Sequence, residues 1–208
     1  MSEIVLSYGD SLIRNSDLEL LKPGCWLNDT IIGFYFEYLQ THVHSDLKDL
    51  LLIGPEVTQF IKLVSQQEVS TILEPLGFSD KELVLFCINS LDRPDVAGGS
   101  HWSLLAFQRS TNTFHHFDSA SSYNLDEARS LARNLSGLIS VQSAKVEVTK
   151  SLQQTNGHDC GVFLLKHAEN IISHYKSNGT LRDLPQLVLT EVNAFRGELH
   201  NLILKLKS

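Results

Sequence analysis

A continuous apolar run from Leu83 to Ile88 constrains the fold of this chain more than any other feature of its sequence. An uninterrupted apolar run of this length, followed by a loop rich in turn-forming residues, is typical of a strand buried inside a sheet. Two more strand-like segments follow, His101–Gln108 and Thr113–Asp118, and the polar residues 109–112 join them. The middle of the chain is therefore predicted to build a sheet.

Helical patterns precede and follow these strands, and one helix is inserted among them. Helices are expected from Asn28 or Asp29 to about Val43, near Pro55–Val64 and Gln67–Glu74, over Leu125–Leu138 and Cys160–Tyr175, and from about Thr190 to Leu206. Ile4–Tyr8 and Lys145–Thr149 are expected to be further short strands. This order predicts one α+β domain over residues 1–208, with a central, mostly antiparallel sheet flanked by helices.

Composition excludes several classes of function. Lys and Arg number 17 against 24 Asp and Glu, and a net charge of −7 argues against nucleic acid as the main partner. No apolar run approaches the roughly 20 residues that span a membrane. The three cysteines, Cys25, Cys87 and Cys160, are widely spaced, which favours a reducing compartment over a disulfide framework. No pair of cysteines or histidines has the spacing of a zinc site, so neither a metal nor another cofactor is expected.

The segment Gln154–Gly161, which reads Gln-Thr-Asn-Gly-His-Asp-Cys-Gly, carries the strongest chemical signal. It places Cys160 where a polar loop becomes an apolar helix. The free N–H groups and the dipole of a helix N-terminus stabilise a thiolate, which is the nucleophilic form of cysteine. Gln154 offers an amide that can donate to an oxyanion. The alternative is a buried structural cysteine, because free cysteine is among the most buried residue types.

A cysteine nucleophile needs a base, and the base needs a residue that orients it. Among nine histidines, His101 differs because it opens a strand directly after a glycine-rich loop. If the two strands form a hairpin centred between Arg109 and Ser110, His101 lies opposite Asp118. Opposed residues have Cβ atoms about 4.5–5.5 Å apart, close enough for a carboxylate to bind an imidazole. The alternative is that Asp118 only begins the turn after its strand.

Four motifs, in this order, resemble the Ulp/SENP cysteine proteases, which cleave after the C-terminal Gly-Gly of ubiquitin-like modifiers. They are Trp26-Leu27-Asn28-Asp29, Gly-Gly-Ser-His-Trp-Ser-Leu-Leu at 98–105, His-Phe-Asp-Ser at 116–119, and the segment around Cys160. The resemblance covers about Leu6 to Tyr175. Within the family the chain is most similar to the small deneddylase branch, at residues 31–34 and 55–62.

The resemblance implies a catalytic role for each matching residue. Cys160 would be the nucleophile and His101 the base and acid. Asp118 would orient His101, and Gln154 would donate to the oxyanion.

It also implies how the modifier's tail is bound. Trp26 and Trp102 would form the lid and wall of a tunnel that only Gly-Gly can thread, although ordinary core packing is the alternative for each. Asp29 and Asn89 would bond the extended tail. The loop Leu91–Ser100 would fold over the modifier.

The function that follows is maturation of a modifier precursor, removal of the modifier from conjugates such as cullins, or both. The enzyme would act as a monomer in the cytoplasm or the nucleus. Three alternatives remain open. One is a protease for SUMO-type modifiers, and another is an inactive module that grips a modifier's tail. The third is a papain-like enzyme that uses Cys25 with His158 or His167, although the rest of that signature is missing.

Overall fold

A five-stranded sheet with the strand order β3-β4-β5-β6-β7 forms the centre of the protein. The structure is a computed structural model that describes residues 3–91, 98–139 and 145–207. The strands of the sheet are β3 (Leu50–Ile53), β4 (Leu83–Asn89), β5 (Trp102–Gln108), β6 (Thr113–Phe117) and β7 (Lys145–Val148). The run from Leu83 to Ile88 is buried throughout, as its apolar sequence predicts.

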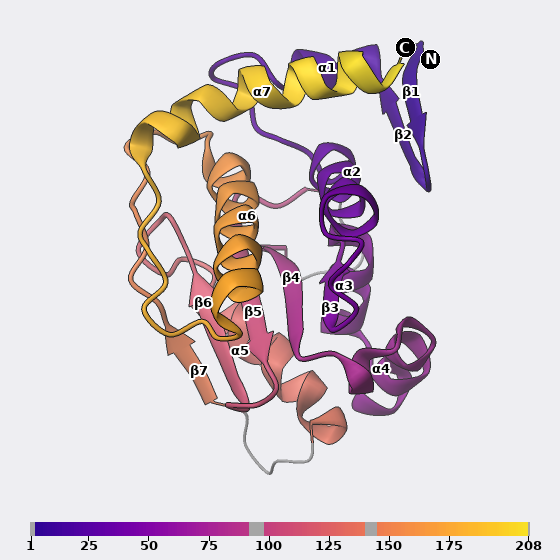
Figure 1. The fold of residues 1–208 in the computed structure, drawn as a ribbon, viewed down its shortest axis with the longest axis vertical. Coiled ribbons are helices and arrows are strands. Elements are labelled where there is room, and N and C mark those ends of the chain that lie inside the picture. The colour runs from indigo at the N-terminus through magenta and orange to yellow at the C-terminus, as the bar shows by residue number, and fades with distance from the viewer. Residues whose placement is uncertain (1–2, 92–97, 140–144, 208) are drawn as a thin grey trace.

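Helices enclose this sheet on both sides (Figure 1). They are α1 (Asn15–Glu19), α2 (Asp29–Tyr38), α3 (Pro55–Leu63), α4 (Gln66–Leu73), α5 (Leu125–Leu135), α6 (Cys160–Asn178) and α7 (Leu189–Lys207). A π-helical turn over Leu39–Val43 continues α2, and 3₁₀ turns cover Glu74–Leu76, Phe78–Asp80 and Ser136–Leu138. The α+β class and the flanking helices are confirmed. No helix within the described ranges is both long enough and apolar enough to cross a membrane.

The pairing of the strands corrects the expected sheet, which is mixed rather than mostly antiparallel. β4 pairs antiparallel with β5, and β5 with β6. β3 pairs parallel with β4, and β6 parallel with β7. Each parallel pair is joined by a helical connection, α3 and α4 for the first and α5 for the second. Parallel neighbours need such crossovers, whereas antiparallel neighbours can be joined by a tight turn.

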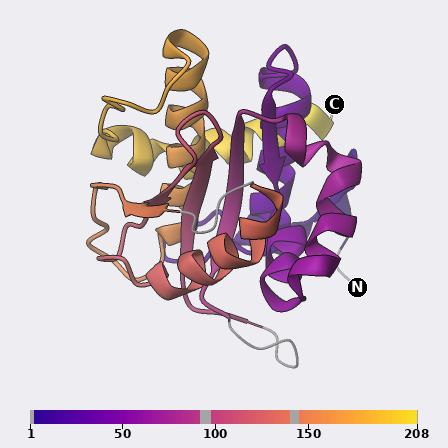
Figure 2. The ribbon, with the colours of Figure 1, turned by 90° about the horizontal axis from the view of Figure 1, so that it is seen from below.

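Two hydrophobic clusters form the core, one on each face of the sheet. Alternate residues of β4 point to opposite faces, so Leu83, Leu85 and Cys87 pack with α2, α6 and α7. Val84, Phe86 and Ile88 pack with α3, α4 and α5 on the other face. Figure 2 shows the strands of the sheet side by side, with α5 on one side of them and α7 on the other. The sheet is thus covered on both faces, which explains why β4 is apolar without interruption.

A separate hairpin of β1 (Ile4–Tyr8) and β2 (Ser11–Arg14) precedes α1 at the N-terminal end. The helix α7 crosses the molecule and packs on β1, so segments from both ends of the sequence lie side by side (Figure 1). The strand Ile4–Tyr8 was expected, while β2, α1 and β3 were not. All three are short, with four or five residues each.

The hairpin that carries the candidate base has a different register from the one expected. Leu104 pairs with Phe117 and Gln108 with Thr113, so the turn comprises residues 109–112. Continued by one position, this register places Asp118 across from Ser103 rather than His101. The expectation was wrong because a two-residue Arg-Ser turn does not suit a hairpin, and the left-handed Asn112 closes a longer turn instead.

Candidate active site

Cys160 is the first residue of α6, as predicted, and its side chain is buried. The preceding residue, Asp159, occupies the cap position, but its side chain does not cap the helix. The Asp159 side chain therefore leaves the first N–H groups of α6 unbound. These N–H groups lie at the positive end of the helix dipole. This end of α6 is the environment in which a thiolate is stabilised.

His101 and Asp118 are joined by a buried hydrogen bond of 2.6 Å between Nε2 and Oδ1. Although the two residues are not opposed, they are diagonal neighbours on one face of the hairpin, a separation that longer side chains bridge. Oδ1 of Asp118 also accepts from the Ala120 N–H at 2.8 Å, and Oδ2 from the Asn124 N–H at 2.9 Å. Burial alone would raise the pKa of Asp118, but these hydrogen bonds hold it below its usual value.

His101 contacts both Asp118 and Cys160, so the structure brings the three residues together. Burial tends to lower the pKa of His101. Hydrogen bonds and charge interactions with Asp118 and Cys160 outweigh burial and raise this pKa to about 9. Because Nε2 binds Asp118, Nδ1 is the ring nitrogen left to face the sulfur. An imidazolium at neutral pH is the partner that a thiolate nucleophile requires.

Gln154 lies in the loop before Cys160, with its amide held by two neighbours. Its Oε1 accepts from the Ser119 hydroxyl at 2.7 Å, and its Nε2 donates to the Asn156 carbonyl at 2.6 Å. The amide nitrogen carries two N–H groups, of which Asn156 takes one. The hydroxyl of Ser119 thus fixes which end of the amide is the donor. The oxyanion role of Gln154 stays a prediction.

All four residues expected to bind the modifier's tail, Trp26, Asp29, Asn89 and Trp102, line one cavity of about 650 Å³. Trp26 is 51% exposed, so core packing is not its role. Its Nε1 donates to the Gly157 carbonyl at 2.7 Å, in the loop that precedes Cys160. The structure brings these residues together, and their contacts with a tail stay predictions.

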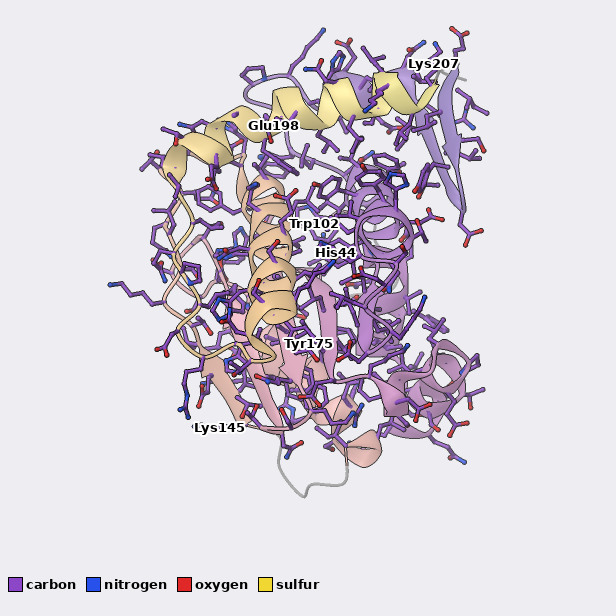
Figure 3. All side chains as sticks on the ribbon, viewed as in Figure 1. His44, Trp102, Lys145, Tyr175, Glu198 and Lys207 are labelled. Atoms are coloured by element: carbon purple, nitrogen blue, oxygen red, sulfur yellow. The ribbon has the colours of Figure 1, made fainter. Side chains whose placement is uncertain are left out.

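Trp102 is the second indole of this cavity and packs partly against the core. In the view of Figure 3 it lies between α6 and α2. Its Nε1 donates to the Leu27 carbonyl at 3.0 Å, so both indoles are fixed to backbone of another segment. Trp102 therefore packs against the core on one side and lines the cavity on the other.

Gly98 and Gly99 close the rim of the cavity, both with positive φ. A Cβ on Gly99 would collide with the Asn89 side chain, so glycine is required there by both conformation and space. The expected loop Leu91–Ser100 is described only at its two ends, and residues 92–97 lie outside the described ranges.

Sequence reasoning missed Asn124, which supports both His101 and Asp118. Its backbone N–H binds Asp118, and its buried side-chain amide donates to the carbonyls of Ile88 and His101, both at 3.3 Å, and to the Ser103 hydroxyl at 3.2 Å. The sequence signal of an asparagine before a helix is that of a cap. Nothing in that signal indicates a bond to a strand.

The papain-like alternative finds no support among these contacts. Cys160, rather than Cys25, is the cysteine with which His101 interacts. His167 is buried against Phe117, and neither of its ring nitrogens has a hydrogen-bond partner. Within the described ranges, no group of three or more His, Cys, Asp or Glu side chains is placed to hold a metal ion.

Thiol proteolysis is the chemistry this arrangement can perform, because a sulfur at a helix end faces a charged imidazole that a carboxylate orients. Residues 25–204 match the Ulp1 protease family, C-terminal catalytic domain. The chain therefore belongs to this family of cysteine proteases, and the resemblance noted in the sequence is confirmed.

Relatives of similar length support this assignment. Sentrin-specific protease 8 of Homo sapiens is 39% identical over 207 residues, covering 98% of this chain and 97% of that protein. NEDD8-specific protease 1 of Arabidopsis thaliana is 37% identical, covering 98% of this chain and 94% of the other. The solved structure of the C-terminal Ulp1 protease domain in complex with Smt3, the yeast ortholog of SUMO, superposes with a TM-score of 0.76. It covers 99% of this chain and 89% of that chain at 19% identity, which is a likeness of fold.

Proposed function

We propose that this protease is a deneddylase that cleaves after the C-terminal Gly-Gly of the neddylation modifier, in precursors or in conjugates such as cullins. The observation that carries the proposal is the 37% identity, across nearly the whole of both chains, to a protease named for NEDD8. The likeness to a domain bound to a SUMO-type modifier is of fold alone, at 19% identity. An inactive tail-binding module is disfavoured because Cys160, His101 and Asp118 are present and in contact.

In the proposed reaction, the Cys160 thiolate attacks the carbonyl carbon of the modifier's last glycine. The oxyanion accepts hydrogen bonds from the Gln154 amide and the Cys160 backbone N–H. His101 gives its proton to the leaving amine, and a thioester remains. Water then loses a proton to His101, attacks the thioester and releases the modifier and the thiolate.

The cavity walled by Trp26 and Trp102 supports the proposed requirement for Gly-Gly. Each indole is anchored through its N–H to backbone, so neither can swing aside freely to admit a side chain. A Gly→Ala change next to the scissile bond should shift the carbonyl away from the sulfur. A misplacement of about 1 Å costs on the order of 10²-fold in rate, which is the loss we expect in kcat/KM.

The choice among modifiers must arise away from the two indoles that hold the tail, because ubiquitin and its relatives share the Gly-Gly end. The part of the cavity formed by α3 is a suitable surface, since Phe60 and Leu63 line it and are 57% and 36% exposed. Exposed apolar side chains on a rim favour contact with an apolar patch of a partner. The segment 92–97, with Asp92, Arg93 and Asp95, adds charges that can attract one modifier and repel another.

The test is a comparison of kcat/KM for C-terminal substrates made from the neddylation modifier, ubiquitin and SUMO-type modifiers. The neddylation modifier should be cleaved at least tenfold better than the others. Phe60→Ser, and separately Gly/Ser replacement of residues 92–95, should narrow this difference without abolishing cleavage. Val188→Ser, at an exposed site before α7, is the matched control and should leave the difference unchanged. Equal cleavage of a SUMO-type substrate would contradict the deneddylase proposal and leave the family assignment standing.

We also propose that the protein works as a monomer in the cytoplasm or the nucleus. All three cysteines are free, and a reducing compartment keeps a catalytic thiol in its active form. Size-exclusion chromatography with light scattering and fractionation of cells test these two proposals.

A further inference from the structure

The helix α7 carries a buried arginine, Arg196, whose guanidinium binds backbone from two distant parts of the chain. Nη1 donates to the Leu20 carbonyl at 2.9 Å, and Nη2 donates to the Cys25 carbonyl at 2.7 Å. Nη2 also reaches the His158 carbonyl at 3.2 Å, and Nε and Nη2 both bind Oδ1 of Asp159, at 2.9 and 2.7 Å. One side chain thus ties the segment before α2 to the loop before α6.

These partners lie next to the two sides of the predicted tail tunnel. Cys25 immediately precedes Trp26, and His158 and Asp159 immediately precede Cys160. The bond from the Trp26 indole to the Gly157 carbonyl joins the same two segments a second time. The distance between the lid and the nucleophile is therefore set by two links, and Arg196 supplies the buried one.

The contact with Asp159 also balances a charge beside the nucleophile. This carboxylate stands one residue before Cys160, and its side chain is only partly exposed. Arg196 neutralises one oxygen of this carboxylate, and the Asn156 amide donates to the other at 2.8 Å. Asn156 Oδ1 in turn accepts from the N–H groups of His158 and Asp159, both at 3.0 Å. The loop is consequently fixed in one conformation by side chains that do not touch the sulfur.

We propose that Arg196 is a positioning residue, which holds Trp26 and the loop before Cys160 at the separation that a threaded Gly-Gly tail requires. It acts through backbone, and in the structure it contacts neither His101 nor the Cys160 side chain. The proposal rests on the tail tunnel and on Cys160 as the nucleophile, as given under the proposed function. It does not depend on which modifier is preferred.

The test compares two rates at Cys160 in the Arg196→Lys protein. Lysine keeps the charge near Asp159 but lacks the planar fork that reaches several carbonyls at once. Labelling by a covalent probe built on the modifier that the wild type cleaves best should slow at least tenfold. Alkylation of Cys160 by iodoacetamide, which needs no tunnel, should stay within about threefold of the wild-type rate. Arg182→Lys, at an exposed position in the loop before α7, is the matched control and should change neither rate.

Two results would overturn the proposal. One is an Arg196→Lys protein with a native circular dichroism spectrum that reacts with the tail probe at the wild-type rate. The other is an equal loss in both rates, which would mean that Arg196 acts on the thiol itself rather than on the tunnel. If Arg196→Lys does not fold, Arg196→Gln decides by the same ratio of rates, because its single amide cannot bind both the segment before α2 and the loop before α6. A wild-type protein that no modifier probe labels would instead contradict the proposed function.

Discussion

At the scale of single residues, the charge on His101 depends on the hydrogen bonds that its partner, Asp118, accepts. Asp118 accepts one hydrogen bond from His101 and two from backbone N–H groups, at Ala120 and Asn124. Each of these bonds favours the ionised carboxylate over the acid. An ionised Asp118 keeps the imidazole oriented and charged, so the proposed base is already in position in the free protein.

Cys160→Ala should abolish cleavage and leave binding of the modifier's tail intact or tighter, because the cavity residues do not need the sulfur. A binding assay such as calorimetry, run beside a cleavage assay, measures both effects. Cys25→Ala and Cys87→Ala are the matched controls and should keep turnover within a few-fold of wild type. A Cys160→Ala protein that still cleaves would refute the assignment of the nucleophile.

Gln154→Ala should lower kcat by about 10²–10³, or roughly 3–4 kcal/mol, as loss of one oxyanion donor does in other enzymes. KM should change little, because the oxyanion forms only after the ground state. Ser119→Ala should give a smaller loss of the same kind, since Ser119 orients the amide of Gln154. Steady-state kinetics decide between roles, because a raised KM with unchanged kcat would make Gln154 a binding residue.

The site residues that could be predicted from the sequence carry reactive side chains, whereas those that were missed act by binding backbone. Cys160, His101 and Asp118 carry reactive groups at the ends of predicted elements, where side chains are free to meet. Asn124 and Arg196 act mainly by donating to backbone carbonyls of distant segments. Every residue offers such a carbonyl, so no pattern in the sequence marks the partner.

At the scale of elements, the first turn of α6 approaches the segment before α2 so closely that a side chain there would be crowded. A Cβ added to Gly161 would lie 3.0 Å from the Leu27 Cβ, which is shorter than ordinary contact. Leu27 is also the residue whose carbonyl binds the Trp102 indole. The close approach of α6 to Leu27 thus fixes the position of Cys160 relative to the Trp102 wall of the cavity.

Gly161→Ala should therefore destabilise the protein by about 1–3 kcal/mol, in the range of overpacked cores, and slow cleavage. Gly197→Ala in α7 is the matched control, because a Cβ there meets nothing within 4 Å. It should stabilise the protein by about 0.5–1 kcal/mol, since alanine is the better helix former. Chemical denaturation measures both changes, and equal stability of the two variants would contradict the packing argument.

Element boundaries could largely be predicted from the sequence, whereas pairing could not. The start of α6 at Cys160 and the buried strand β4 follow from local patterns of polar and apolar residues. The parallel pairing of β3 with β4 depends on a crossover that local patterns do not specify. The four residues of β3 were missed because so short a run resembles the end of a helix as much as a strand.

At the scale of the whole molecule, buried histidines should give stability a maximum near pH 6.5. Burial lowers the pKa values of His116 and His167 to about 4, so the unfolded chain binds more protons and stability falls as the pH drops from 6.5 to 4. The pKa of His101 is raised to about 9, so its contribution is complete below pH 6.5 and is lost as the pH rises to 9. One pKa unit corresponds to about 1.4 kcal/mol, so the free energy of unfolding should fall by a few kcal/mol on the acid side and on the alkaline side of the maximum.

Urea denaturation at pH 4.5, 6.5 and 9 tests this profile. His167→Leu should weaken the fall in the free energy of unfolding between pH 6.5 and 4.5. Asp118→Asn should weaken the fall between pH 6.5 and 9. Phe117→Leu, at the aromatic partner of His167, is the matched control and should lower the whole profile without changing its shape. An acid side that stays as steep in His167→Leu would show that other groups cause it.

The contacts of Arg196 have a consequence for how the active enzyme is formed. Its bond to the Leu20 carbonyl joins residues 176 positions apart, and its bond to the Cys25 carbonyl spans 171. Closing such long loops is entropically costly, so contacts of this kind form late in folding. A chain folding from the denatured state should regain its helices well before it can cut a peptide bond. If Arg196 has its proposed positioning role, partly folded molecules should therefore lack cleavage activity.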